Sequence, residues 1–289
     1  MIELGRLGLG TAPLGGLYEP VEEETARRVV ERALELGIRY FDTAPYYGSG
    51  LAERRLGAVL RETPRDAFVL STKVGRLLRP DAAGWEGAYF DFSRDATLRS
   101  LEESLERLGL DRVDIALVHD PDEHFNEALA GAFPALASLR DEGVVRAIGA
   151  GMNQVEMLCR FAREADPDCF LVAGRWTVLD RAAGAELLSL CEERGIAVIA
   201  GGVFNSGVLA GGDAFDYERA PPEVVTRVEE LEDTCLRHGV PLKAAAVQFP
   251  LKHPAVASVL VGCRTPDEVE ENVRLAELDI PSTLWTVLG

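Results

Sequence analysis

Four ionisable side chains of different types stand where short apolar runs of the chain end. Asp42 closes the run IRYFD, Tyr47 follows it in the next loop, Lys73 comes after VLST, and His119 closes ALVH. Burying a charge is costly unless a partner compensates it, so we expect these groups to face one another. A carboxylate, a phenol, an ammonium and an imidazole in one cluster would support proton transfer to or from a carbonyl or alcohol oxygen.

The phenol is the candidate acid or base of this cluster. A tyrosine titrates at about 10, and we expect a Lys73 cation held by Asp42 to favour the phenolate and lower the pKa of Tyr47. His119 would hydrogen-bond the same substrate oxygen and polarise it. None of these groups can carry a hydride, so a redox reaction at this site would need a cofactor.

The elements that must hold these residues alternate between helix and strand. Amphipathic stretches end near a glycine and lead into an apolar run, as in ERALELG-IRYFD and CEERG-IAVIA, which is typical of a helix C-cap before a buried strand. Eight strands are predicted, over residues 8–11, 38–42, 67–72, 113–118, 145–149, 170–173, 197–200 and 258–261. This α/β alternation predicts a (β/α)8 TIM barrel, a single domain over residues 1–289, with its active site at the carboxyl ends of the strands.

A doubly wound nucleotide-binding fold is the alternative architecture. It would need Gly-x-Gly-x-x-Gly directly after a strand and opening a helix. The glycine pairs Gly8/Gly10 and Gly149/Gly151 do not continue into that pattern. If the protein binds a dinucleotide, we expect it to do so without this fingerprint.

Composition narrows the classes of partner. The net charge of -18 opposes binding to nucleic acid or to an anionic membrane, and favours a small-molecule substrate. No apolar run is long enough for a spanning helix, and the start of the chain does not resemble a secretion signal, so a cytoplasmic location is expected. The five cysteines are widely spaced without Cys-x-x-Cys, and we interpret them as reduced core residues. Nothing in the sequence predicts the oligomeric state.

Several motifs, in order along nearly the whole chain, resemble those of the aldo-keto reductases. They are FDTAPYYG (41–48) with Glu53, STKV (71–74), RSLEESLERLG (99–109), DIALVH (114–119) and VGCRTPDEVEEN (261–272). The resemblance implies a (β/α)8 barrel that binds an extended nicotinamide dinucleotide, NAD or NADP, across its C-terminal mouth. It also implies that Asp42, Tyr47, Lys73 and His119 form the catalytic tetrad, which are the same four residues found above.

The resemblance extends to the cofactor and the reaction. Asn153 matches the position that holds the nicotinamide carboxamide, and Arg264 and Asn272 match the adenosine-binding segment. The motifs GTAPLGG (10–16), HDPD (119–122) and GAGMNQ (149–154) resemble the branch of aldose dehydrogenases and pyridoxal 4-dehydrogenase. This implies oxidation of a sugar hemiacetal to a lactone with Tyr47 as base; a pyridoxal dehydrogenase or a general aldehyde or ketone reductase is the alternative.

The chain departs from the family pattern around the nicotinamide. Met152 replaces the usual serine, Ala173 the usual glutamine, and Gly201 the usual stacking aromatic. Phe204 or Trp176 could supply the ring contact, although packing explains both equally well.

Glu268 stands where many NADP-dependent members have an arginine for the 2′-phosphate. A carboxylate there would repel the phosphate and could accept hydrogen bonds from ribose, which favours NAD. Alternatively, Glu268 only stabilises the last helix through its dipole, and Arg264 holds a phosphate.

The long loop over residues 75–95 is the candidate substrate loop. We expect Trp85 and Tyr89 to contact substrate, because aromatic faces suit the apolar face of a sugar. The alternative is that the loop aromatics, with Phe90 and Phe92, only anchor the loop to the barrel.

Two other functions are compatible with parts of the sequence. A metal-dependent barrel hydrolase would use the ligands His119, Asp120, Asp122 and His124, although strand 1 lacks His-x-His. A noncatalytic module that senses the nicotinamide redox state would not need the complete tetrad.

Overall fold

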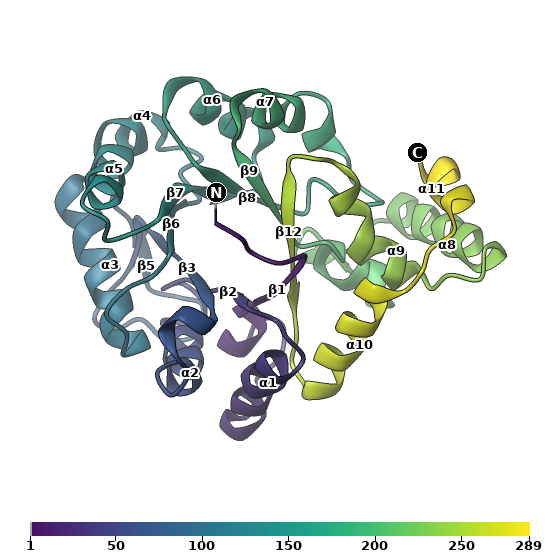
Figure 1. Cartoon of the computed structure of the whole chain (residues 1–289), viewed down its shortest axis with the longest axis horizontal. Coiled ribbons are helices and arrows are strands. Elements are labelled where there is room, and N and C mark those ends of the chain that lie inside the picture. Colours follow the sequence, from purple (N-terminus) through teal and green to yellow (C-terminus); the bar gives the residue numbers. More distant parts are fainter. Residues whose placement is uncertain (1) are drawn as a thin grey trace.

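Eight parallel strands close into a barrel at the centre of the molecule (Figure 1), in the computed structural model that describes residues 2–289. Their order around the barrel is β1-β12-β9-β8-β7-β6-β3-β2. The strands are β1 (Leu7–Gly10), β2 (Tyr40–Asp42), β3 (Val69–Val74), β6 (Ile115–His119), β7 (Ala147–Met152), β8 (Cys169–Ala173), β9 (Ala197–Gly201) and β12 (Val256–Gly262). The predicted (β/α)8 barrel is confirmed, and the doubly wound alternative is wrong.

Helices surround the barrel, and α8 and α11 project from one side of it (Figure 1). They are α1 (Glu23–Glu35), α2 (Leu51–Leu60), α3 (Arg94–Leu108), α4 (Phe125–Glu127), α5 (Phe133–Asp141), α6 (Val155–Glu164), α7 (Leu187–Arg194), α8 (Pro222–Arg237), α9 (Leu242–Gln248), α10 (Pro266–Glu277) and α11 (Ser282–Leu288). Among residues 2–289, none of the helices combines the length and the apolar character needed to cross a membrane.

Glycines end helices where the sequence predicts a C-cap. Gly109 after α3 and Gly195 after α7 have φ of 65° and 70°, in the left-handed region that glycine adopts without a Cβ clash. The amide of Gly109 donates to Leu105 O and Glu106 O, so the last turn of α3 is closed before the chain enters β6. These two glycines therefore mark where α3 gives way to β6 and where α7 gives way to β9.

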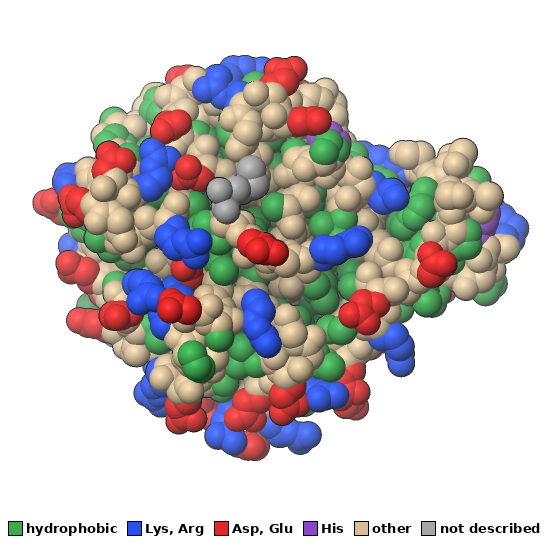
Figure 2. All heavy atoms as spheres, in the orientation of Figure 1, with side chains coloured by type: hydrophobic (Ala, Val, Ile, Leu, Met, Phe, Trp, Pro, Cys, Tyr) green, Lys and Arg blue, Asp and Glu red, His purple; other side chains and the backbone are tan. Residues whose placement is uncertain are grey.

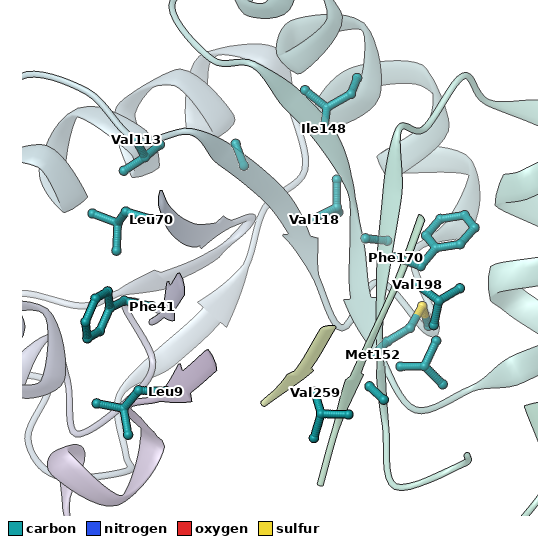
Figure 3. Packing of buried hydrophobic residues seen from close by; sticks show 14 of the residues in the cluster. Leu9, Phe41, Leu70, Val113, Val118, Ile148, Met152, Phe170, Val198 and Val259 are labelled. Carbon is teal, nitrogen blue, oxygen red and sulfur yellow. The ribbon is translucent and has the colours of Figure 1, made fainter. Parts of the chain in front are cut away.

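The core has an outer and an inner part. Figure 3 shows the outer part, in which Leu9, Phe41 and Leu70 on neighbouring strands pack between the barrel and the helices. Inside the barrel, Leu117 and Ile199 belong to a second buried cluster that fills its interior. Because apolar side chains fill most of the barrel, the charged residues Asp42 and Lys73 lie toward the carboxyl ends of their strands. All five cysteines are free and buried, as predicted.

The 75–95 loop differs from the sequence prediction. It contains an antiparallel hairpin of β4 (Arg76–Leu78) and β5 (Ala88–Phe90). Strand β3 also runs two residues further than predicted, so Lys73 lies within it instead of after it. A second small hairpin, β10 (Ala214–Phe215) and β11 (Glu218–Arg219), follows β9.

The surface carries both charges in mixture. Figure 2 shows acidic and basic side chains interspersed over the face seen in Figure 1, with no large basic patch on that face. Many of these charges are paired, as are Arg32 and Glu270 between α1 and α10 at 2.9 Å. Exposed pairs of this kind contribute little to stability, at most about 1 kcal/mol each.

Candidate active site

Three of the four tetrad residues come from adjacent strands at one end of the barrel. Asp42 is the last residue of β2, Lys73 lies near the end of β3, and His119 is the last residue of β6. The parallel register pairs Asp42 with Ser71 and Lys73 with Leu117. The predicted convergence at the carboxyl ends of the strands is therefore present.

The Lys73 ammonium connects the cluster. Its Nζ donates to Asp42 Oδ2 at 2.7 Å, to the Thr43 carbonyl at 2.9 Å and to the Tyr47 hydroxyl at 3.0 Å. Ser71 donates to the other oxygen of Asp42 at 2.7 Å. The three donors of the ammonium are thus all used, and the buried charge is fully compensated.

A tight backbone approach places Tyr47. The amide of Tyr47 donates to the Ala44 carbonyl at 3.1 Å, which closes the turn after β2. The neighbouring loop packs against this turn so closely that a Cβ at Gly15 would lie 2.6 Å from the backbone carbonyl carbon of Tyr47. Gly48, with φ of 63°, takes the left-handed conformation that lets the chain leave the turn. These two glycines let the phenol reach Lys73.

The environment of Tyr47 corrects one expectation from the sequence. Burial raises the pKa of Tyr47 above its usual value; Lys73 opposes this shift and Asp42 adds to it. The expected net lowering is therefore wrong, because desolvation of the phenolate exceeds the attraction of the ammonium. Burial by itself would lower the pKa of Lys73, but its pairing with Asp42 and Tyr47 raises it, so the lysine is a cation at neutral pH.

His119 supplies a neutral imidazole beside the phenol. Its ring lies 6.0 Å from that of Tyr47, at an interplanar angle of 87°. Burial lowers the pKa of His119 well below its usual value, and the cations Lys73 and Arg76 lower it further. Nδ1 is buried and has no hydrogen-bond partner in the described part of the chain, whereas Nε2 faces the Asp120 carboxylate at 3.6 Å. We therefore assign the proton of the neutral imidazole to Nε2, because a proton on Nδ1 would be a buried N–H without an acceptor.

Arg76 was not predicted from the sequence, and Asp120 was considered as a metal ligand, as a partner of His119 and as part of the HDPD motif. Arg76 Nη1 donates to Asp120 Oδ2 at 2.8 Å, and its guanidinium carbon lies 3.3 Å from the ring centroid of Tyr46. Asp120 has a φ of 46°, which is uncommon for a residue other than glycine. The position of Asp120 directly after His119 was the signal in the sequence that could have indicated its role. The contact with Arg76 of β4 could not be read from the sequence, because it depends on how the hairpin folds.

Trp85 lies against the tetrad. Its ring is 5.9 Å from that of Tyr47 and 5.2 Å from that of Tyr46, and the Tyr46 hydroxyl donates to the Trp85 carbonyl at 3.1 Å. Ser49 donates to the carbonyl of Gly84, next to Trp85. The loop that joins β4 and β5 is therefore held over the tetrad, and Trp85 is in a position to contact substrate.

Tyr89 lies elsewhere on the same hairpin. Its hydroxyl accepts a hydrogen bond from Arg99 of α3 at 3.5 Å, and within residues 2–289 no hydrogen bond or ring contact joins it to the tetrad. Phe92 is buried in the core and Phe90 stacks on it at 5.9 Å, so this pair anchors the end of the hairpin. Of the two predicted substrate contacts, Trp85 lies against the tetrad and Tyr89 does not, and contact of Trp85 with substrate stays a prediction.

The candidate cofactor residues lie at the far side of the same mouth. Asn153 follows β7 and is half-buried. Asn272 and Asn205 are buried, and their amide nitrogens donate to Cys263 Sγ and to the Gly174 carbonyl. Within residues 2–289, the amide oxygen of each has no partner. Buried acceptors without partners suit the N–H groups of a bound molecule. Asn205, which the sequence analysis missed, lies in the loop after β9.

Arg264 and Glu268 bind each other at the start of α10. Arg264 donates to Glu268 at 3.1 Å and to Glu19 at 2.7 Å. Glu268 also accepts from the Arg264 amide at 2.7 Å, while the Thr265 side chain caps the helix. The carboxylate therefore stabilises the N-terminus of α10 and holds the guanidinium at the same time. The N-terminus of a helix also suits a phosphate group, and α10 begins just after the carboxyl end of β12.

The three departures from the family pattern all lie at strand ends on this side. Met152 is the last residue of β7, and Ala173 pairs with Gly201 at the ends of β8 and β9. Trp176, one of the two possible replacements for the ring contact, packs against Phe249, with the ring centroids 5.1 Å apart and the planes tilted by 42°. Phe204 is half-buried and also packs against the core.

The ligands considered for a metal-dependent hydrolase do not form a metal cluster. Among residues 2–289, no three His, Cys, Asp or Glu side chains are grouped so as to hold a metal ion. His124 bonds Glu127 at 2.6 Å, and its ring lies against Phe90. In the HDPDEH segment (119–124), His119 and Asp120 therefore belong to the catalytic site, whereas His124 packs against the aromatic residues of the hairpin.

Together, the barrel, the lysine-bound phenol and the neutral imidazole define a barrel enzyme with acid–base chemistry on a substrate oxygen. The chain belongs to the aldo/keto reductase family, whose family model matches residues 6–286. It is 44% identical to D-threo-aldose 1-dehydrogenase of Pseudomonas sp. and 42% identical to pyridoxal 4-dehydrogenase of Microbacterium luteolum, each alignment covering 98% of this chain and 92% of the relative.

More distant relatives agree. L-galactose dehydrogenase of Arabidopsis thaliana is 33% identical over 94% of this chain and 84% of its own. The holo form of an aldo-keto reductase from Bacillus halodurans superposes with a TM-score of 0.83 at 26% identity, covering 98% of this chain and 90% of that one. The protein is thus an oxidoreductase that works with a nicotinamide cofactor, as the motifs implied.

Proposed function

We propose that this protein is an aldose dehydrogenase that oxidises the C1 hemiacetal of a sugar to a lactone, with NAD as the oxidant. The observation that carries the chemical part is the position of Lys73, whose Nζ bonds both Asp42 and the Tyr47 hydroxyl. The sugar is suggested by the relative named D-threo-aldose 1-dehydrogenase, at 44% identity. We expect the reaction to take place in the cytoplasm.

Bound NAD would accept the hydride from C1 of the sugar. The proton of the C1 hydroxyl goes to the Tyr47 phenolate, so that a C=O bond forms as the C–H and O–H bonds break. Lys73 stabilises the phenolate before the proton arrives, and the neutral His119 donates a hydrogen bond from Nε2 to the same substrate oxygen. Asp42 keeps the ammonium in place.

Asn153, Asn205 and Asn272, with the N-terminus of α10, are the groups that we expect to hold the dinucleotide. The preference for NAD rests on Glu268. Its carboxylate bonds Arg264, the candidate group for a 2′-phosphate, and Glu19 holds that arginine from the other side. A phosphate would have to displace two carboxylates from Arg264 and would still lie near both of them.

A screen of aldoses, pyridoxal and simple aldehydes with NAD and with NADP tests the proposal, read by the absorbance of the reduced cofactor. We expect the highest kcat/KM for an aldose with NAD. Turnover of pyridoxal alone would assign the protein to the activity of its second relative. Turnover confined to reduction of simple aldehydes would contradict the proposed direction and substrate.

A further inference from the structure

The residue after the catalytic histidine holds an unusual backbone conformation. Asp120 has φ of 46°, and its amide donates to the Gly151 carbonyl at the end of the neighbouring strand at 3.1 Å. A left-handed conformation costs about 1 kcal/mol or more at a residue other than glycine, although aspartate tolerates it better than most. This conformation turns the chain sharply at the mouth, so that the carboxylate lies beside the imidazole.

The position of the carboxylate is also determined from another element. Arg76 of β4 donates to Oδ2 at 2.8 Å, and its guanidinium lies over the ring of Tyr46. The side chain of Asp120 is 30% exposed, so part of it faces the open mouth. An ionised carboxylate accepts about four hydrogen bonds, and the arginine uses one of them.

The carboxylate is close to the place where the chemistry occurs. Its Oδ2 lies 3.6 Å from His119 Nε2, which is too long for a good hydrogen bond. A substrate oxygen bonded to Nε2 would lie about 2.9 Å from that nitrogen. A second hydroxyl on the adjacent carbon of the substrate therefore falls within reach of Asp120, while the first is held by His119 and Tyr47.

We propose that Asp120 is a specificity-determining residue, which accepts a hydrogen bond from the hydroxyl on the carbon next to the reacting carbon. For an aldose oxidised at C1 this is the C2 hydroxyl. The proposal rests on the proposed function. Arg76 is the positioning residue that holds the carboxylate at this place.

The expected effect is large enough to measure. A hydrogen bond to a charged group is worth about 1.5–3 kcal/mol, and a site built around a hydroxyl disfavours the analogue that lacks it. We therefore expect kcat/KM of the parent protein to be about 10- to 100-fold lower for a 2-deoxyaldose than for the matching aldose.

The test compares each aldose with its 2-deoxy counterpart in the parent, Asp120→Gly and Asp120→Asn. Glycine accepts the left-handed backbone and removes the acceptor, so the ratio of the two kcat/KM values should fall to about one. Asparagine keeps an uncharged acceptor, so its ratio should be intermediate. Asp81→Asn, an exposed change on the same hairpin loop, is the matched control and should keep the parent ratio.

The ratio separates recognition from a structural effect, since a displaced His119 would slow both sugars equally and leave the ratio unchanged. An unchanged ratio in both Asp120 variants would overturn the proposal, as would a parent ratio of about one. Both of these results leave the aldose dehydrogenase assignment standing, whereas failure of the parent to oxidise any aldose contradicts the proposed function itself. If Asp120→Gly does not fold, the kcat/KM ratios of the parent and of Asp120→Asn test the proposal.

Discussion

The ammonium of Lys73 lies 3.0 Å from the hydroxyl of Tyr47, and it is the group that most favours the phenolate in a site whose burial opposes it. The pair is held by β3 and by the turn after β2, which meet because their strands are adjacent in the barrel. The ease of proton transfer by Tyr47 therefore depends on the balance between desolvation of its phenolate and the attraction of the Lys73 ammonium.

Lys73→Met should move the pH optimum for oxidation upward and lower the rate. The lysine lowers the pKa of Tyr47, so its loss raises that pKa further, and the phenolate needed as base forms only at higher pH. The pH profile of kcat/KM for an aldose measures this. A profile that keeps its shape and loses only height would mean that Lys73 acts by position, and the electrostatic account would be wrong.

The recognition of the C2 hydroxyl should depend on pH on the acid side. Burial raises the pKa of Asp120 to about 6, with Asp122 adding to the shift, while Arg76 and Lys73 oppose it and His119 is neutral. As the pH falls through about 6, the carboxylate gains a proton and becomes a poorer acceptor. The preference for an aldose over its 2-deoxy counterpart should therefore shrink below that pH, and Asp120→Asn should show no such change.

The same shift has a consequence for stability. The pKa of Asp120 is higher in the folded protein than in the unfolded chain, so its ionisation disfavours folding, and this cost grows as the pH rises from about 4 to about 6. Asp120→Asn should remove the cost. Thermal unfolding of the two proteins at pH 5 and pH 7 checks the sign, and a parent that gains stability relative to Asp120→Asn as the pH rises would contradict it.

Glu268→Arg should shift the ratio of catalytic efficiencies toward NADP by about tenfold, equivalent to roughly 1.4 kcal/mol. The carboxylate repels a 2′-phosphate near the surface, so higher salt should reduce the NAD preference of the parent. Glu268→Gln is the matched control, because it keeps an acceptor for the Arg264 amide and removes the charge. A parent that prefers NADP, or a ratio unchanged in Glu268→Arg, would show that other residues, Arg264 first among them, set the choice.

Strand positions and the tetrad could be predicted from the sequence because both follow from local patterns. A helix that ends at a glycine leads into a buried strand, and parallel strands bring their last residues to one rim. These two patterns were enough to predict that Asp42, Lys73 and His119 lie close together. The pKa of Tyr47 could not be predicted, because its sign depends on how much water the folded site excludes.

The contacts made by the β4–β5 hairpin could not be predicted from the sequence either. The pairing of Arg76 with Asp120 requires the hairpin to fold back over the mouth, and no local pattern specifies that contact. Trp85 and Tyr89 are four residues apart, and both were expected at the substrate. Trp85 lies in the loop between the two strands, over Tyr47, whereas Tyr89 lies on β5 and bonds α3.

The most direct test of the account is the turnover of Tyr47→Phe with the best aldose and NAD. Removing the hydroxyl removes the base and leaves the dinucleotide site intact, so kcat should fall by about 10²-fold or more while cofactor affinity, measured by fluorescence titration, stays nearly the same. Turnover equal to that of the parent would show that Tyr47 is not the group that exchanges the proton.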